Sequence, residues 1–292
     1  LIAAIHQRRL DIMKLLLQNG ADPNQSDKNN FLPVIQLAKG IQDMDENGLR
    51  LIETDHVDNF MIPALKLLLE SGLLIDKHQA LSKNWWKPGG TSALYELLYL
   101  MPDYEKLLLR NKENHAKVLK FVKCMCENGA DPLESRKCTR QADSDLSHRH
   151  PPLCIAISNG DLETVQYMLG FIRSQNRPFP HDKLPLLQLA IYNEPPSPDS
   201  NFNQLAAIEV PMMTALLQAG ATDFDAAINK ILSIDFFEHI TERITTYLAR
   251  DLRLIVLLIS SGANISNGRF KRLLFMLQGL RKSLVPFPPV LS

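Results

Sequence analysis

A ten-residue phrase that returns along the chain constrains its fold more than any other feature. The first copy reads Leu15-Leu-Leu-Gln-Asn-Gly-Ala-Asp-Pro-Asn24. Each copy places an apolar stretch directly before a glycine, which is typical of an amphipathic helix that ends in a left-handed residue. Related copies close on Gly72, Gly129, Gly220 and Gly262. A repeated helical unit of this kind predicts an array of stacked units.

A second phrase stands ahead of most of these copies and predicts a second helix in each unit. A proline opens the phrase and suits the first turn of a helix, where its missing N–H is not needed. An alanine follows a few residues later and allows neighbouring helices to approach closely. The copies read Leu32-Pro-Val-Ile-Gln-Leu-Ala38, Leu184-Pro-Leu-Leu-Gln-Leu-Ala190 and Pro151-Pro-Leu-Cys-Ile-Ala156, with a looser copy at Gly89-Gly-Thr-Ser-Ala-Leu94.

Together the two phrases resemble the ankyrin repeat, a unit of two helices and a protruding loop in about 33 residues. The resemblance implies an all-α solenoid of stacked helix pairs. We expect one domain over residues 1–292, with a C-terminal capping helix near Phe270–Leu280. The expected repeats are 1–30, 31–80, 81–140, 150–180, 184–223 and 224–266, followed by a cap at 267–292.

The spacing of the closing glycines departs from the ankyrin pattern. They stand at 20, 72, 129, 220 and 262, so the intervals are 52, 57, 91 and 42. The longest interval hides a copy in which Ile172 replaces the glycine. The extra residues are expected between the two helices of a repeat, at the end remote from the loops that join repeats. They lie near 41–60, 101–114, 194–209 and 235–250.

The register of the phrase also predicts helix starts and a buried set. Pro63 and Pro211 each lie nine residues before a closing glycine, so each is expected to begin an outer helix. Because Leu1 aligns inside a repeat, we expect a longer protein before it. The apolar triplet must face its neighbours, so the equivalent positions should be buried. These positions are Leu16, Leu68, Met125, Met168, Leu216 and Leu258.

Composition excludes several classes of protein. Lys plus Arg and Asp plus Glu both total 32, so the formal net charge is zero and the basic excess of a nucleic-acid binder is missing. No apolar run reaches the length of about 18 residues that predicts a membrane span. Four cysteines are too few to staple a chain of 292 residues, which favours a reducing, cytoplasmic compartment.

The cysteines admit two interpretations. In one, Cys124 and Cys126 form half of a metal site, with Cys138 and two histidines nearby. In the other, they fill leucine positions of the helix phrase and pack as small apolar residues. The second is favoured, because the spacing matches no common zinc site. Cys138 lies in a polar loop and is the one candidate for a reactive thiol. We therefore expect no catalytic residue, no metal and no cofactor.

The candidate binding residues lie in the loops between repeats. Trp85 and Trp86, with Lys87, precede a glycine pair in such a loop, and large aromatic side chains are enriched at binding hot spots. Either both indoles pack beneath the loop, or at least one faces a partner. Two further loops are polar and are solvated surfaces or binding edges. Their candidate residues are Asp27, Lys28, Asn29, Arg136, Lys137, Arg140 and Arg149.

The resemblance implies a protein-binding module that grips its partner with the concave face and the loops, as a monomer and without enzymatic activity. Two alternatives remain open: a regulatory module of an enzyme whose catalytic part lies outside this chain, and a nucleic-acid-binding solenoid. The long insertions are also similar in style to ankyrin proteins that intracellular bacteria deliver into the host cytosol. A bacterial effector that acts on host proteins is therefore a further expectation.

Overall fold

The computed structural model of the chain describes residues 1–28, 31–40, 42–44, 50–52, 56–76, 92–99, 112–134, 151–177, 184–191, 202–233 and 243–266, together with residues 268, 271 and 274. These described residues form an all-α structure with a single two-stranded hairpin, which confirms the predicted fold class. The chain divides into two compact units, Leu1–Asn176 and Arg177–Ser292. The division falls near the end of the predicted fourth repeat, 150–180. The repeat boundaries and the single domain stay predictions.

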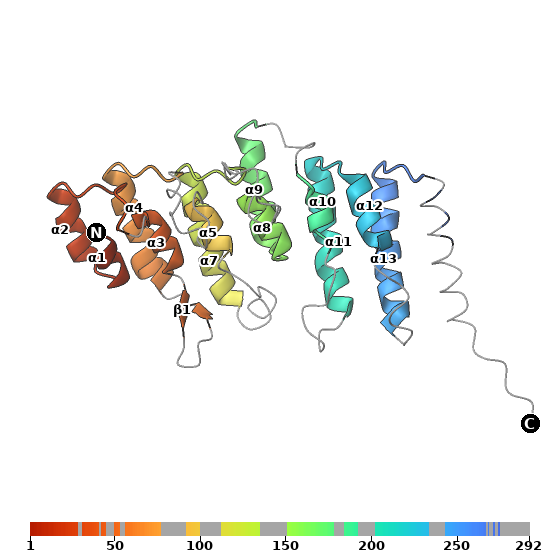
Figure 1. Cartoon of the computed structure of the whole chain (residues 1–292), viewed down its shortest axis with the longest axis horizontal. Coiled ribbons are helices and arrows are strands. Elements are labelled where there is room, and N and C mark those ends of the chain that lie inside the picture. The colour runs from red at the N-terminus through yellow and green to blue at the C-terminus, as the bar shows by residue number, and fades with distance from the viewer. Residues whose placement is uncertain are drawn as a thin grey trace, which may run out of the picture. The chain divides into compact units, whose positions relative to one another are not determined.

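The first unit is a row of helix pairs in two layers. The inner layer runs α1, α3, α5 and α8, and each helix packs against the next; the outer helices α2 and α4 contact each other, as do α7 and α9. Figure 1 shows the pairs side by side in chain order. The inner helices are α1 (Ile2–His6), α3 (Pro33–Lys39), α5 (Ala93–Tyr99) and α8 (Pro152–Ser158); the outer helices are α2 (Leu10–Gln18), α4 (Ile62–Glu70), α7 (Lys112–Glu127) and α9 (Leu162–Ser174).

The first predicted insertion, residues 41–60, holds structure of its own. Strands β1 (Gln42–Met44) and β2 (Arg50–Ile52) pair antiparallel, with Asp43 opposite Leu51. A π-helix, η1 (Val57–Met61), then leads directly into α4. Figure 1 shows the hairpin at the end of the helices remote from the connection that follows α2. The first insertion therefore projects in the predicted direction.

The second unit repeats the pairing with longer outer helices. It contains α10 (Leu186–Leu189), α11 (Phe202–Ala219), α12 (Phe224–Ser233) and α13 (Arg243–Ser260). Parts of the predicted insertions, residues 202–209 and 243–250, belong to α11 and α13, so they lengthen the outer helices to 18 residues each.

The two prolines chosen as helix starts behave differently. Pro63 is the second residue of α4, as predicted. Pro211 lies inside α11, so the prediction that it begins the helix is wrong. Proline lacks the N–H that bonds four residues back, yet α11 continues through this position. The insertion before Pro211 supplies these additional helical residues.

The closing glycines end the outer helices as the repeated phrase predicts. All five adopt positive φ, between 87° and 103°. After α2, the Gly20 N–H donates to the Leu17 carbonyl and the Ala21 N–H to the Leu16 carbonyl. This pair of bonds satisfies carbonyls that the helix end leaves free, and it requires a left-handed residue at the glycine. The sequence therefore located these five helix ends correctly.

Where Ile172 replaces the glycine, the outer helix continues. Ile172 is buried inside α9, which ends at Ser174. Asn176 then takes the left-handed conformation, with φ of 51°. Asparagine tolerates this conformation better than most residues with a side chain. The lost glycine is thus replaced four residues later, and the helix gains about one turn.

The core follows the predicted register with one exception. Five of the six positions, those from Leu68 to Leu258, have no exposed surface. Leu16 is half-buried, so that part of the prediction is wrong. Helix α2 packs against α1 and α4. The predicted cap, 267–292, lies outside the described residues except at 268, 271 and 274, which are helical.

Candidate functional site

Two of the ten predicted binding residues, Asp27 and Lys28, lie among the described residues. Trp85, Trp86 and Lys87 fall outside them, as do Asn29 and the four basic residues between 136 and 149. Lys28 is exposed. Asp27 is half-buried: its N–H donates to the Phe31 carbonyl at 3.0 Å, and its carboxylate accepts from the Phe31 N–H at 2.9 Å. Asp27 therefore stabilises the conformation of the loop, and the Lys28 side chain is exposed to solvent.

Side chains four residues after a closing glycine tie consecutive loops together. The Asn24 side-chain amide donates to the Gly72 carbonyl, and its oxygen accepts from the Leu74 N–H, both at 2.8 Å. The Asp76 carboxylate accepts from the Asp131 N–H at 3.2 Å. Because each bond links one repeat to the backbone of the next, the loop edge of the first unit is held in a fixed spacing.

Arg8 occupies a backbone position that favours glycine. It forms the turn between α1 and α2 with φ of 53°. The equivalent residue between α8 and α9 is Gly160, with φ of 74°. A side chain in this conformation costs roughly 1–2 kcal/mol. The Arg8 guanidinium lies 2.6 Å from the His56 ring nitrogen, which joins the turn to the residue preceding η1.

A hollow of about 160 Å³ lies beside this turn. Its lining comes from α1, the Arg8 turn, α3 with Gly40, and η1. Gln36 and Leu37 are buried, whereas His6 is exposed. The residues that line it are Ile5, His6, Arg8, Gln36, Leu37, Lys39, Gly40, Phe60 and Met61. No pattern in the sequence predicted this hollow, although the arginine at a glycine position is a signal that marks it.

A buried histidine joins two outer helices of the first unit. The His115 ring lies 3.0 Å from the Asp161 carboxylate and 3.4 Å from that of Glu163. Asp161 also accepts the Thr164 N–H at 2.9 Å and so caps α9. Burial lowers the pKa of His115, but the hydrogen bond and the charges of the two carboxylates outweigh it, so the pKa lies above its ordinary value. These contacts stabilise the packing of α7 on α9.

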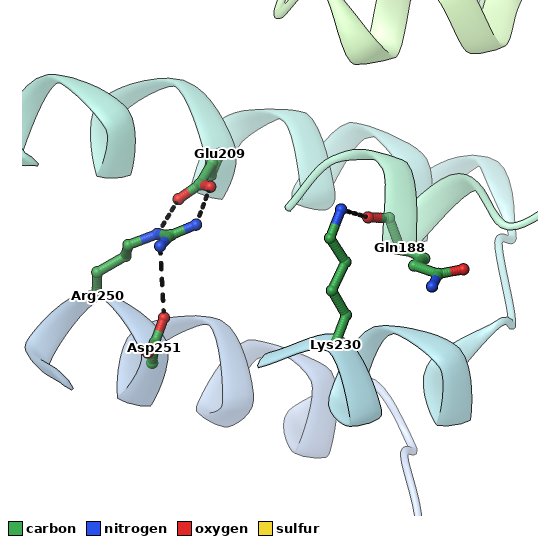
Figure 2. Close-up of polar contacts among 5 residues, drawn as sticks. All are labelled: Gln188, Glu209, Lys230, Arg250 and Asp251. Atoms are coloured by element: carbon green, nitrogen blue, oxygen red, sulfur yellow. Dashed lines mark hydrogen bonds and ion pairs between the residues drawn. The ribbon is translucent and has the colours of Figure 1, made fainter. Parts of the chain in front are cut away.

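The second unit contains a buried ionic cluster, which Figure 2 shows. The Arg250 guanidinium of α13 donates two hydrogen bonds to the Glu209 carboxylate of α11, one of them at 2.5 Å. The Asp251 carboxylate lies 3.7 Å from the same guanidinium. All three residues are at least 97% buried. Lys230 of α12 donates separately to the Gln188 carbonyl of α10 at 3.0 Å.

Asp251 is the least satisfied member of this cluster. Neither of its carboxylate oxygens has a hydrogen-bond partner among the described groups. Burial raises the pKa of Asp251 to about 7, although the charge of Arg250 opposes the shift. Burial also lowers the pKa of Lys230. The cluster therefore holds one firm ion pair, Glu209–Arg250, and one carboxyl group that the fold prefers to keep protonated.

Asp251→Asn should remove a pH dependence of stability. The folded pKa of about 7 lies above the unfolded value of about 3.9, so the stabilising contribution of the protonated carboxyl is complete below pH 4 and is lost as the pH rises through 7. Asparagine does not ionise, so the variant should gain roughly 4 kcal/mol relative to wild type at pH 9 and little at pH 4. Urea melts at both pH values measure this; an equal gain at both would contradict it.

The described cysteines have packing roles. Cys126 and Cys154 are buried, and Cys124 is half-buried. Burial, with the charges of three nearby carboxylates, raises the pKa of Cys126 to about 12. Such a thiol is a poor nucleophile at neutral pH. Cys138 lies outside the described residues. In the part of the chain that the structure describes, no three His, Cys, Asp or Glu side chains converge as a metal site requires.

Comparison with family profiles gives a match at the start of the chain. The family profile of the ankyrin repeat matches residues 1–28, the segment that holds α1, α2 and the first closing glycine. No curated protein sequence matches the chain. Within the described residues, no helix is long and apolar enough to cross a membrane. The helix pairs beyond residue 28 stack in the sequential manner of an ankyrin-like array. Residues 1–28 are an ankyrin repeat, and they form the helix pair α1–α2 of this helical repeat array.

Proposed function

We propose that this chain binds another protein through the loops between its repeats and the inner helices beside them. One observation carries the proposal: an ankyrin repeat at residues 1–28 is followed by further stacked helix pairs. Ankyrin repeats are protein-binding modules. An array of repeats offers an extended surface whose area grows with the number of units. Binding then depends on complementarity and a few anchoring side chains.

The ties between loops support a preformed binding edge. Asn24 and Asp76 hold each loop to the next through backbone hydrogen bonds. A rigid edge loses less conformational entropy on association, which favours affinity. Lys28 is exposed on this edge, and Asp27 fixes the turn that carries it. The other predicted loop residues, Trp85 to Lys87 and those between 136 and 149, complete the proposed edge.

The first experiment compares capture from a cell lysate by wild-type chain and by loop variants. Of the two single substitutions, Trp85→Ala and Trp86→Ala, one should weaken partner binding by about 2 kcal/mol or more, because it removes the buried contact of an aromatic anchor. The same variant should retain the wild-type melting temperature. The matched control is Val256→Ala, at a side chain of the outer helix α13 that is 63% exposed and lies away from the loops.

Fluorescence identifies which indole is accessible before any partner is known. The chain has two tryptophans, so its indole emission reports on Trp85 and Trp86 alone. Trp85→Phe and Trp86→Phe isolate each emission in turn. The indole that anchors a partner should be quenched by acrylamide. Emission that resists quenching in both variants would contradict the prediction and direct the search to the inner helices.

The same binding assay separates the two alternatives. Phosphate contacts with nucleic acid give an affinity that falls steeply with salt, whereas a protein partner held by apolar anchors shows a weaker dependence. A regulatory role beside an enzyme would appear as capture of that enzyme. The interpretation as a bacterial effector depends on the long insertions alone, and no comparison supports it.

A further inference from the structure

We propose that the hollow beside Arg8 binds an acidic segment of the partner protein: one apolar side chain enters it, and a neighbouring aspartate or glutamate carboxylate pairs with Arg8 and Lys39. This inference rests on the proposed protein-binding function and adds a further contact, at the turns between paired helices rather than at the loops between repeats. The hollow is defined by α1, α3 and η1 of the first unit, all within the described residues.

The charge of the lining determines the sign of the partner. Arg8 and Lys39 are cationic, His6 is exposed beside them, and none of the nine lining residues is acidic. The Lys39 ammonium lies 3.5 Å from the Glu96 carboxylate and 4.5 Å from the centre of the Phe31 ring. These contacts hold it in place, and it keeps donors for a second carboxylate. Charge-assisted hydrogen bonds to a carboxylate are stronger than neutral ones.

The size and apolar lining of the hollow determine which side chain of the partner can enter it. Its apolar lining comes from Ile5, Leu37, Phe60 and Met61. A volume of about 160 Å³ is well below the roughly 300 Å³ at which small-molecule pockets begin. A space of this size suits the end of one side chain. An anchoring residue from a protein segment fits this space better than a free metabolite.

The backbone of Arg8 gives an independent argument for a functional residue. The turn favours glycine, and the chain does place Gly160 at the equivalent position of a later repeat. Arg8 nevertheless carries a side chain through a left-handed conformation and directs it to the hollow and to His56. Strained backbone conformations concentrate at binding sites, where the side chain they position is needed. Glycine here relieves the strain but removes the guanidinium.

The test uses a capped pentapeptide, acetyl-Gly-Glu-Leu-Glu-Gly-amide, whose only carboxylates are side chains. Binding is followed by NMR on the labelled methyl groups of Met61 and Ile5, which lie in the hollow. The peptide should shift both signals at millimolar concentration, and its lysine counterpart, acetyl-Gly-Lys-Leu-Lys-Gly-amide, should not. Absence of a shift with the acidic peptide, or equal shifts with both peptides, would overturn the proposal.

Arg8→Gly separates binding from folding. The variant should melt at the same temperature or a few degrees higher, because it relieves the strain, yet bind the acidic peptide about tenfold more weakly. Arg8→Lys keeps the charge and should recover most of the affinity. Lys14→Gln, at an exposed lysine that does not line the hollow, should leave the affinity unchanged. Wild-type affinity in Arg8→Gly would overturn the proposal.

A second arm keeps the two proposals distinguishable. The Arg8→Gly chain is also tested against whichever protein the lysate experiment captures. If that protein binds Arg8→Gly as tightly as wild type, the hollow is not its site and the inference fails, while the protein-binding function stands. If no protein is captured but the acidic peptide still binds in an Arg8-dependent way, the hollow stands and the broader proposal fails.

Discussion

Arg250→Met should lower the free energy of unfolding of the second unit by about 3–5 kcal/mol. The substitution removes the cation that holds Glu209 and leaves that carboxylate buried, with no exposed surface, between α11 and α13. An uncompensated charge at such a site is among the most costly single changes. Hydrogen exchange of the amides in α11 and α13 measures the loss locally, without interference from the first unit.

A double variant distinguishes the cost of a buried charge without its partner from the net contribution of the ion pair to stability. Glu209→Met combined with Arg250→Met removes both charges and keeps their volume. It should recover most of the lost stability, because well-packed apolar residues replace buried ion pairs at little cost. Two earlier repeats support the choice of an apolar residue here. Met61 and Val118 occupy the positions equivalent to Glu209, and both are buried. A double variant as unstable as the single one would show that the pair itself stabilises the unit.

Leu68→Ala should lower the free energy of unfolding of the first unit by about 2–5 kcal/mol. Leu68 has no exposed surface in α4, and the substitution removes apolar contacts and leaves a cavity between repeats. The matched control is Leu15→Ala, from the same apolar triplet one repeat earlier, at a side chain that is 60% exposed. It should cost less than about 1 kcal/mol. Urea melts of both variants give the comparison, and equal losses would contradict the register.

The register of the repeated phrase predicted local structure well because it depends on local chemistry. A glycine that follows an apolar triplet ends a helix through its own backbone freedom, wherever the helix lies. For this reason Gly20, Gly72, Gly129, Gly220 and Gly262 were located without a structure. The buried leucine and methionine positions followed from the same periodicity. Leu16 failed because its burial depends on a neighbouring helix that the phrase does not contain.

The insertions were poorly predicted for a related reason. Their length was evident from the glycine spacing, but their conformation depends on what they pack against. Residues 202–209 and 243–250 are helical, and Glu209 meets Arg250 between α11 and α13. Residues 42–52 include the paired strands of the hairpin. No short-range signal marks such partners, since the two charged residues stand 41 positions apart.

The candidate site divides in the same way. Sequence alone predicted a binding role for the loops between repeats, with Trp85, Trp86 and the polar residues of those loops, and this stays a prediction. It missed the hollow, whose walls come from segments far apart in the chain: α1, α3 and η1. Arg8 was visible in the sequence as an exception at a glycine position. Its role could be inferred only from the conformation of the turn and the side chains beside it.

Local pattern in the sequence was enough to predict the class of fold, the ends of five outer helices and most of the buried apolar positions. These properties arise from backbone freedom and periodicity within about ten residues, so they need no knowledge of neighbours. The tertiary structure alone decided how far the outer helices extend, which charges are buried together, and where Arg8 and Lys39 border an apolar hollow. These properties depend on which distant residues share a space, and pairing of that kind is a matter of packing and desolvation rather than of local pattern.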